Sequence, residues 1–388
     1  MSTYQGCDFL NINDLLSEEE RMIRDTVRDY TTKEIMPIIS DYYMRGEFPK
    51  HLIPGLAELG VFGATIQGYD CAGLNYTSYG LIMQELERGD SGLRSVVSVQ
   101  GALCMYPIYA FGTEEHKKKY LPKMAKGEWI GCFGLTEPDF GSNPGGMITR
   151  AKKDGNDYIL NGSKMWITNG NIADLAIVWA KNDENKIVGF IVDKGTPGFS
   201  ARKIEKKYSL NASITSELIF EDCRVPASQM LQVQGLRGPF ACLNNARFGI
   251  SWGALGAAMA CYEEALTYAK TRIQFDKPIA GFQLVQAKLA NMYTEITKAQ
   301  LLALHVGRLK DQDKALAQHI SMAKMNNVSM ALDCARTARD ILGASGITFE
   351  YQCGRHMLNL ESVNTYEGTE DIHRLVIGEY ITGIPAYR

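Results

Sequence analysis

The chain has 388 residues, of which 45% are hydrophobic, and its 41 basic and 44 acidic residues leave a net charge of −3. This length accommodates two or three domains of roughly 100–200 residues, with enough apolar residues for a large core. The near balance of charge argues against a nucleic acid or an anionic membrane surface as a partner, and no run approaches the roughly 20 apolar residues that span a bilayer.

The N-terminal stretch MSTYQGCDFLNIND lacks the features of a signal peptide or of an arginine-rich transit peptide. We therefore expect a cytoplasmic bacterial protein, or a mitochondrial matrix protein if the chain is a processed eukaryotic one. The nine cysteines are scattered without a CxxC pair, which is typical of reduced structural thiols. The six histidines show no ligand spacing such as HExxH, so we predict no metal site.

The first segment, residues 1–128, has the pattern of a helical domain. Ser17 followed by Glu20 is typical of a capping box that opens a helix, and charged and apolar residues then recur at helical spacing. The same spacing returns at residues 81–88 and 116–126.

The second segment, residues 129–238, predicts a β-domain. The dipeptides Asp154-Gly155 and Asn161-Gly162 predict turns on either side of a short strand at 158–160. Further strands are predicted at residues 173–180, 187–192 and 217–220. Because the connections are too short to hold crossover helices, we expect a mostly antiparallel sheet.

The third segment, residues 239–388, is again helical. Long periodic stretches cover residues 250–271, 282–310 and 314–342, and they favour a helical bundle.

Two motifs in the β-segment combine hydroxyl groups with apolar or aromatic neighbours. Residues 133–138 read FGLTEP, and residues 166–169 read WITN. A hydroxyl can bond one edge of a flat heterocycle while an aromatic neighbour packs on its face. The simpler alternative is an ordinary strand end with turn residues. The sequence has no GxGxxG after a strand and no P-loop, so a Rossmann or nucleotide-hydrolase function has no support.

The stretch NTYEGTEDI at residues 364–372 places a carboxylate between an aromatic residue and a glycine. Tyr366 can shield Glu367 from water and raise its pKa toward the range of a general base. A structural alternative is a helix N-terminus, with Thr369 as the cap and acidic residues in the first turn. The two interpretations are compatible.

A charge run lies at residues 85–94, with Glu87 and Arg94 among its members. Such a run is usually a solvated helix face, and Gly89 and Gly92 argue against one continuous helix. From the pattern alone we expect Arg94 to be a surface arginine.

Five motifs together, in this order, resemble the acyl-CoA dehydrogenase family, and the resemblance extends over essentially the whole chain. They are GLTEPDFGS at 134–142, WITN at 166–169, RIQFDKP at 272–278, LGASG at 342–346 and YEGTEDI at 366–372. The resemblance implies an α+β fold with an N-terminal helical domain, a central antiparallel β-domain and a C-terminal four-helix bundle.

The resemblance also implies bound FAD between the β-domain and the C-terminal helices. Thr136 and Thr168 would bond the flavin, and Trp166 would pack against it. Arg272 and Gln274 match family residues that reach the FAD of a neighbouring subunit, which implies a homotetramer. The other residues implied in cofactor binding are Phe133, Leu135, Ser142, Phe275, Gly343, Gly346, Thr369 and Asp371, and Ser142 would also contact CoA.

Within the family, four stretches resemble the glutaryl-CoA dehydrogenase branch. They are ELERGDSGLRSVVSVQ at 85–100, LNNARFGI at 243–250, GRLKDQD at 307–313 and NTYEGTEDIH at 364–373. The resemblance makes Arg94 the residue that binds the distal carboxylate of the substrate. The remaining residues implied in substrate binding are Glu87, Ser98, Ser142, Tyr366, Asn244 and Arg247.

Glu367 matches the catalytic base of most family members. The implied reaction is FAD-dependent oxidation of glutaryl-CoA followed by decarboxylation to crotonyl-CoA and CO2, with electrons passed to an electron-transfer flavoprotein. The alternatives are a short-chain acyl-CoA oxidase or dehydrogenase, a glutaryl-CoA dehydrogenase that does not decarboxylate, and a non-catalytic flavin or acyl-CoA binding protein.

Overall fold

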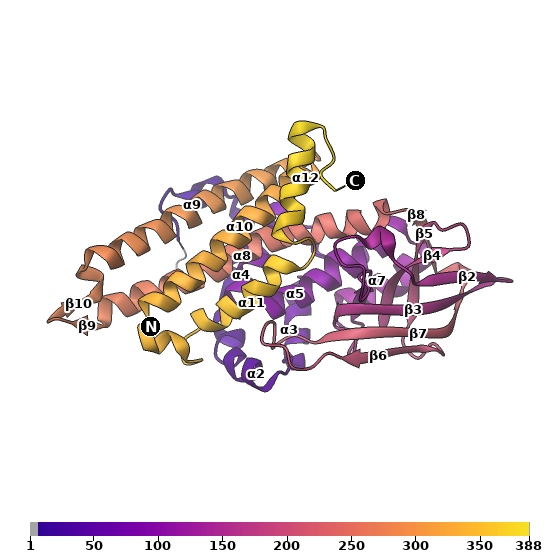
Figure 1. The fold of residues 1–388 in the computed structure, drawn as a ribbon, viewed down its shortest axis with the longest axis horizontal. Helices are drawn as coiled ribbons and strands as arrows, with labels where there is room; N and C mark the ends of the chain where they lie inside the picture. The colour runs from indigo at the N-terminus through magenta and orange to yellow at the C-terminus, as the bar shows by residue number, and fades with distance from the viewer. Residues whose placement is uncertain (1–6, 388) are drawn as a thin grey trace.

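The computed structural model describes residues 7–387; the first six residues, on which part of the expectation about the N-terminus rests, and residue 388 lie outside that range. A sheet lies at one end of the molecule, and three long helices extend from it to the other end (Figure 1). The predicted α+β fold is confirmed: helices precede the sheet, and a helical bundle follows it.

The N-terminal helices surround the start of the bundle and one side of the sheet. Their bounds are α1 Glu18–Tyr30, α2 Ile39–Arg45, α3 Ile53–Glu58, α4 Tyr76–Gly89, α5 Ser91–Ser98, α6 Tyr106–Phe111 and α7 Glu114–Ala125, with π-helical turns at Thr31–Ile35 and Val99–Met105. The predicted capping box opens α1: the amide of Glu20 donates to Ser17 Oγ over 3.2 Å, and the amide of Ser17 donates to Glu20 Oε2 over 2.8 Å.

The helical run through residues 76–98 breaks at Asp90. Its backbone is extended, and its carboxylate accepts the amide of Gly92 over 2.6 Å, so that Asp90 is the N-cap of α5. A second oxygen of Asp90 accepts hydrogen bonds from Arg355 and Asn359, which ties α5 to α11. The break predicted from the two glycines is therefore confirmed.

The expectation that the charge run is a solvated face is wrong. Glu85, Glu87 and Asp90 are fully buried, and Arg88 and Arg94 are nearly so. The reason is that α4 packs against both α1 and α8, and α5 packs against α8 and α11. Opposite charges within the run, and between it and Arg28, satisfy one another, so that the charged groups are paired where water is excluded.

The central sheet has eight strands, and β1 and β2 pair with different parts of the internal strand β4. Those two pairings are parallel and the other five are antiparallel, as expected of a mostly antiparallel sheet. The bounds are β1 Gly131–Gly134, β2 Arg150–Asp154, β3 Asp157–Thr168, β4 Leu175–Asn182, β5 Ile187–Asp193, β6 Phe199–Lys203, β7 Thr215–Pro226 and β8 Met230–Gln234.

The turn predicted at Asn161-Gly162 is wrong. Strand β3 runs through both residues, and its register against β7 shifts between Leu160 and Gly162. Gly162 has a φ of +142°, and a Cβ on it would lie 2.6 Å from Thr149 Oγ1. The glycine thus serves a β-bulge and a close approach of the backbone.

The C-terminal helices form a bundle in which α10 packs against α8, α9, α11 and α12. Their bounds are α8 Arg237–Thr271, α9 Gln283–Asp311, α10 Ala317–Ile341, α11 Cys353–Thr365 and α12 Glu370–Thr382, and the hairpin of β9 Ile273–Gln274 and β10 Lys277–Pro278 joins α8 to α9. Glycines at 249, 253 and 256 let α8 approach α4; at Gly256, a Cβ would lie 1.8 Å from the carbonyl oxygen of Gln84.

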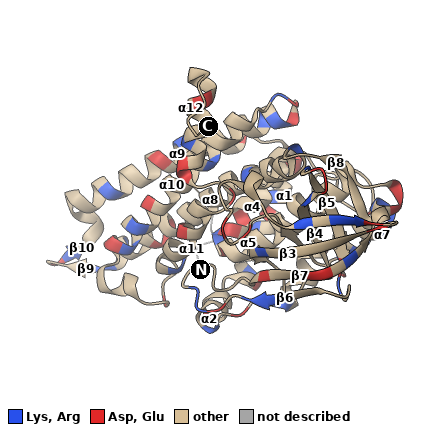
Figure 2. Ribbon diagram, turned by 45° about the vertical axis from the view of Figure 1, so that its right-hand side comes forward, with Lys and Arg blue, Asp and Glu red and all other residues tan. Residues whose placement is uncertain are grey.

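Basic and acidic residues are interspersed along the bundle helices and the outer strands (Figure 2). None of the helices between residues 7 and 387 has the length and hydropathy needed to cross a bilayer.

Candidate active site

The loop between α11 and α12 presents Glu367 in a constrained backbone. Glu367 has a φ of +55° and Gly368 a φ of +96°, both in the left-handed region that favours glycine. The three carbonyl groups of this loop are held by cations. Lys324 Nζ on α10 donates to the carbonyl oxygens of Tyr366 and Gly368 over 3.1 and 2.7 Å, and Arg247 Nε on α8 donates to that of Glu367 over 2.7 Å.

Glu367 is half-buried as a residue, but one oxygen of its carboxyl group is inaccessible to water. Its Oε2 atom is buried and has no hydrogen-bond partner within residues 7–387. Burial raises the pKa of Glu367, although the positive charges of Arg94, Arg247 and Lys324 oppose the rise. A carboxylate that is dehydrated, unbonded and raised in pKa is suited to accept a proton. The amide of Glu367 also donates no hydrogen bond to any described residue, so it is free to bond an incoming oxygen.

Arg94 lies beside this loop and is only 1% exposed. Its Nε donates to Glu87 Oε2 over 2.6 Å, its Nη2 donates to the hydroxyl of Tyr366, and its guanidinium carbon lies 5.7 Å from the centre of the Tyr366 ring. Although burial opposes the charge, the carboxylate of Glu87 keeps the pKa of Arg94 above its usual value. Arg94 is therefore a buried cation that bonds Tyr366, the residue before Glu367, and its charge acts on the Glu367 carboxyl group.

The partners of Arg94 are fixed by close packing. Ser91 Oγ donates to the other oxygen of Glu87 over 2.8 Å. Gly253 on α8 faces the ion pair, since a Cβ there would lie 2.0 Å from Glu87 Oε2 and 3.2 Å from Arg94 Cδ. The hydroxyl of Ser98, one helical turn after Arg94, is buried without a hydrogen bond among the described residues. It is a donor available to a ligand in this space.

An exposed indole lies at the C-terminal end of β3, with two threonine residues near it along the backbone. Trp166 is 60% exposed with a φ of +65°, in a second bulge of β3 where the register shifts between Lys164 and Ile167. The amide of Met165 donates to the carbonyl oxygen of Thr136 over 2.8 Å, which places Thr136 beside the bulge. Thr168 lies two residues after Trp166 on the same strand. An exposed aromatic ring with two threonines on the neighbouring backbone fits the flavin that the sequence implies.

A buried ion pair joins β3 to the segment that follows β1. Lys164 Nζ donates to Glu137 over 2.8 Å, and Glu137 accepts the amides of Ile148 and Thr149 over 2.6 and 3.0 Å. Burial lowers the pKa of Lys164 to about 8. The pair holds the loop that contains Ser142, so the glutamate of the 134–142 motif is structural.

The structure brings together Glu87, Arg94, Ser98, Arg247, Tyr366 and Glu367. Asn244 lies one turn before Arg247 on α8, and Thr369 is the N-cap of α12, accepting the amide of Ile372 over 3.3 Å. Asp371 is exposed in the first turn of α12 and pairs with Arg374. The helix start predicted as an alternative is thus present, and it coexists with the buried glutamate.

The remaining predicted cofactor residues do not all lie together in one chain. Phe133 and Leu135 are buried at the end of β1, and Ser142 is exposed in the next loop. Arg272, Gln274 and Phe275 lie on the β9–β10 hairpin at the end of the molecule opposite the sheet (Figure 1). The turn that includes Gly343 and Gly346 follows the end of α10.

Lys324 was not among the predicted site residues, although it is fully buried and contacts the loop on both sides of Glu367. A signal was present: Lys324 falls at helical spacing among the apolar residues Ile320, Ala323 and Val328. A lysine on the apolar face of a helix needs a buried acceptor.

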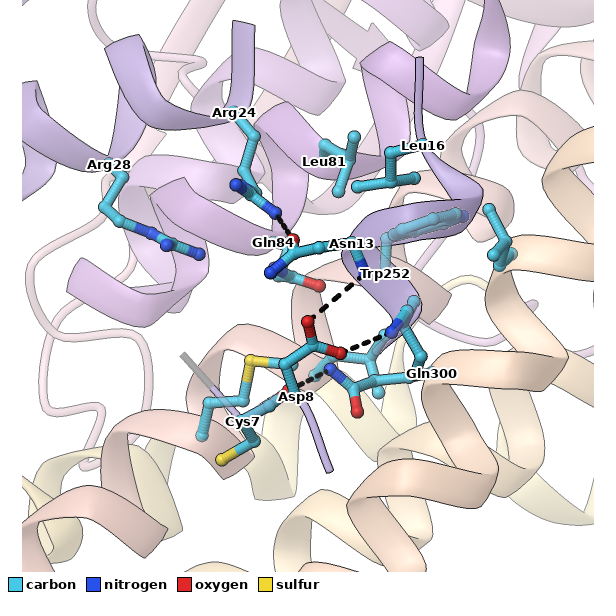
Figure 3. A pocket seen from close by; sticks show the side chains of 14 residues that line it. Cys7, Asp8, Asn13, Leu16, Arg24, Arg28, Leu81, Gln84, Trp252 and Gln300 are labelled. Carbon is cyan, nitrogen blue, oxygen red and sulfur yellow. Dashed lines mark hydrogen bonds between the residues drawn. The ribbon is translucent and has the colours of Figure 1, made fainter. Parts of the chain in front are cut away.

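A separate cavity of about 40 Å³ lies beneath the N-terminal segment, between α1, α4, α8 and α9 (Figure 3). Asp8 accepts the amides of Ile12 and Asn13 over 2.5 and 3.2 Å, and Gln300 Nε2 donates to the carbonyl oxygen of Cys7 over 2.7 Å. The cavity has room for a water molecule but not for a thioester, and it contains no predicted site residue.

Three family models match the chain in the order of the structure. They are described as the N-terminal, middle and C-terminal domains of acyl-CoA dehydrogenase, and they match residues 17–128, 132–223 and 234–382. A curated relative, the mitochondrial short-chain specific acyl-CoA dehydrogenase of Bos taurus, is 36% identical over 380 residues, which cover 96% of this chain and 92% of the relative.

Two solved structures resemble the whole chain. A crystal structure of glutaryl-CoA dehydrogenase from Mycobacterium smegmatis is 55% identical and has a TM-score of 0.97. The match covers 99% of this chain and 100% of the solved chain. A glutaryl-CoA dehydrogenase from Mycobacterium smegmatis in complex with FADH2 is 51% identical with a TM-score of 0.98, and the match covers 100% of both chains. The chain therefore belongs to the acyl-CoA dehydrogenase family, whose members oxidise acyl-CoA thioesters with FAD as the cofactor.

Proposed function

We propose that this acyl-CoA dehydrogenase oxidises glutaryl-CoA between its α and β carbons and then decarboxylates the product to crotonyl-CoA and CO2. The observation that supports this substrate is the buried guanidinium of Arg94 beside the Glu367 loop. Its Nη1 atom makes no hydrogen bond within residues 7–387, so it can donate to a carboxylate. A buried guanidinium suits a carboxylate and would be costly to place against a plain alkyl tail.

The residues of the candidate site have separate roles in the proposed reaction. Arg94 and Ser98 bind the distal carboxylate, with Glu87 and Tyr366 holding the guanidinium, and Asn244 and Ser142 contact the thioester and CoA parts. Glu367 removes the α-proton, while its own amide bonds the thioester oxygen on which negative charge develops. FAD, when bound, supplies the acceptor for the hydride that leaves the β-carbon.

Decarboxylation follows from the same arrangement. The bond between the γ-carbon and the distal carboxylate breaks, CO2 leaves, and the electron pair enters the conjugated thioester as a dienolate. Glu367, which now carries the α-proton, returns a proton to the dienolate and completes crotonyl-CoA. The base is thereby restored to its ionised form.

We further propose a homotetramer that passes electrons to an electron-transfer flavoprotein. Thr136, Trp166 and Thr168 would hold the flavin from the sheet, with Phe133 and Leu135 beneath it. Arg272, Gln274 and Phe275 on the distal hairpin, and Gly343 and Gly346 at the end of α10, would complete the cofactor site of a neighbouring subunit. Phe275, 86% exposed in the single chain, supports a contact between subunits.

The substrate assignment is tested by steady-state kinetics with glutaryl-CoA and butyryl-CoA and an artificial electron acceptor. We expect wild type to prefer glutaryl-CoA in kcat/KM, and Arg94→Met to lose about 10²–10³-fold of that preference, the cost of one charged hydrogen-bonded contact. Arg355→Met is the matched control, since Arg355 is another buried arginine paired with an aspartate away from the loop. It should keep the substrate ratio even if it lowers stability.

The similarity to a short-chain acyl-CoA dehydrogenase makes butyryl-CoA oxidation the second candidate function. Equal or better turnover of butyryl-CoA by wild type would favour it over the proposed substrate. Hydrogen peroxide formed in step with turnover would instead identify an oxidase.

A further inference from the structure

Lys324 lies inside the helical bundle and bonds the loop that contains Glu367. It is fully buried on α10, and its Nζ bonds the carbonyl oxygens of Tyr366 and Gly368, the residues on either side of Glu367. Lys164, the other fully buried lysine within residues 7–387, instead pairs with the carboxylate of Glu137.

The two hydrogen bonds define the conformation of the loop. After Tyr366, which ends α11 in an extended conformation, Glu367 and Gly368 are both left-handed, and Thr369 then caps α12. A non-glycine residue holds a left-handed conformation only when its surroundings fix it. Lys324 supplies that fixation on both sides of Glu367, and Arg247 supplies it at the central carbonyl.

Several charged or titratable groups face Lys324 and Glu367. They are Arg94 on α5, Tyr79 on α4, Arg247 on α8, Glu370 and His373 on α12, and Tyr366 in the loop. Burial, Lys324 and Arg247 together lower the pKa of His373 to about 3, so its ring is neutral near pH 7. Burial lowers the pKa of Lys324 itself to about 7, with the charge of Glu367 opposing the fall, so its ammonium is charged in mildly acidic solution.

We propose that Lys324 is a positioning residue for the base: its buried ammonium clamps the 366–368 loop, and its positive charge favours the ionised form of Glu367. The inference rests on the proposed role of Glu367. It predicts two separable effects, one of geometry on kcat and one of charge on the pH at which the base is protonated.

The test compares FAD-loaded wild type with Lys324→Met and Lys324→Gln in kcat, KM and the pH profile of kcat/KM for glutaryl-CoA. Methionine removes both the charge and the donors, whereas glutamine keeps two donors without the charge. We expect the acid limb of the profile to move up by about 1 pH unit in both variants, since an opposite charge near a carboxylate lowers its pKa by about that much or more. We expect kcat to fall by about 10²-fold in the methionine variant and less in the glutamine variant, because a misplaced base loses about that much.

Lys310→Met is the matched control. Lys310 is also a substantially buried lysine, with a pKa lowered to about 8 by burial, but its ammonium lies 4.0 Å from the ring centre of Tyr76 and bonds no part of the 366–368 loop. It should leave the acid limb in place. Flavin absorbance reports cofactor content in every variant, and exchange of the substrate α-proton with deuterium reports the base directly.

An acid limb that stays at the wild-type pH in a folded, flavin-loaded Lys324→Gln protein would overturn the inference, as would a shift of equal size in Lys310→Met. Glu367→Gln in parallel separates this from failure of the proposed function. If Glu367→Gln still exchanges the α-proton, the base lies elsewhere. If it does not exchange and the Lys324 variants keep the wild-type limb, only the role of Lys324 is wrong.

Discussion

At Glu367, the ionised carboxylate that the reaction needs lowers the stability of the fold. Burial raises its pKa above the ordinary value of 4.5, so the folded protein binds a proton at this site more tightly than the unfolded chain does. The ionised carboxylate therefore costs stability above its folded pKa, and the cost vanishes below the unfolded pKa. Active sites often contain such destabilising groups.

Glu367→Gln should accordingly raise the thermal midpoint at pH 8 while it abolishes α-proton removal. The gain should shrink as the pH falls and should vanish below 4.5, where the glutamate becomes protonated in both states. Thermal unfolding of both proteins across this range is the measurement. A stabilisation independent of pH would show that the effect is one of packing and not of charge.

Arg94 and Glu87 form a buried pair whose members depend on each other. Arg94→Met should destabilise the fold by about 3–5 kcal/mol, because it leaves Glu87 charged and unpaired in the interior. Adding Glu87→Leu should recover most of that loss, since an apolar pair of similar volume is tolerated. Chemical denaturation of the two single variants and the double variant gives the coupling, and simple additivity would show that the two groups act independently.

The identity of the site residues was predictable only in part. Glu367 lies between an aromatic residue and a glycine, and this local pattern was enough to predict a general base. The burial of Arg94 was not visible, because it arises from α8, α11 and Tyr366 packing around α5, and those contacts are distant in sequence. The role of Lys324 depends on a loop more than 40 residues away, so spacing within α10 marks it as buried but does not give its partner.

At the scale of elements, the approach of α8 to α4 sets the geometry of the substrate end. Gly253→Ala places a methyl group 2.0 Å from Glu87 Oε2, so the ion pair must move. We expect a loss of about 1–3 kcal/mol, the usual cost of overpacking, together with weaker binding of glutaryl-CoA.

Gly378→Ala in α12 is the control for helix propensity. A Cβ at Gly378 meets no atom within 4 Å, and the residue lies inside a helix. This variant should gain up to about 1 kcal/mol. Thermal midpoints and KM for glutaryl-CoA compare the two variants, and a neutral Gly253→Ala would contradict the view that packing on α8 holds the Glu87–Arg94 pair.

The element boundaries show the same division between local and distant causes. The capping box at Ser17, the break near Gly89 and the helix start at Thr369 follow from local hydrogen bonds, and the sequence predicts them. The two bulges of β3 do not, because they depend on the match between β3 and its partner β7. Asn161-Gly162 has the composition of a turn, yet the pairing with β7 extends the strand through it.

At the scale of the whole molecule, the distance of the β9–β10 hairpin from the sheet predicts that subunits share their cofactor sites. One variant would carry Arg272→Ala and Gln274→Ala on the hairpin, and another would carry Thr136→Ala and Thr168→Ala on the sheet. Each alone should bind FAD weakly. Co-expressed, they should assemble mixed tetramers in which some sites combine an intact sheet with an intact neighbouring hairpin.

Flavin content per subunit, measured with the mass of the assembly by light scattering, tests this expectation. We expect the co-expressed sample to recover FAD binding above the level of either variant alone. A monomer that binds FAD fully, or mixed assemblies with no recovery, would contradict shared sites.

The central claim is that Arg94 and Glu367 bind opposite ends of one short dicarboxylic thioester. The most direct measurement is mass analysis of the thioesters and the CO2 formed when the FAD-loaded enzyme is incubated with glutaryl-CoA as the only substrate. We expect crotonyl-CoA and CO2 in equal amounts from wild type, with neither formed by Glu367→Gln. Glutaryl-CoA recovered unchanged, from an enzyme that oxidises butyryl-CoA under the same conditions, would contradict it.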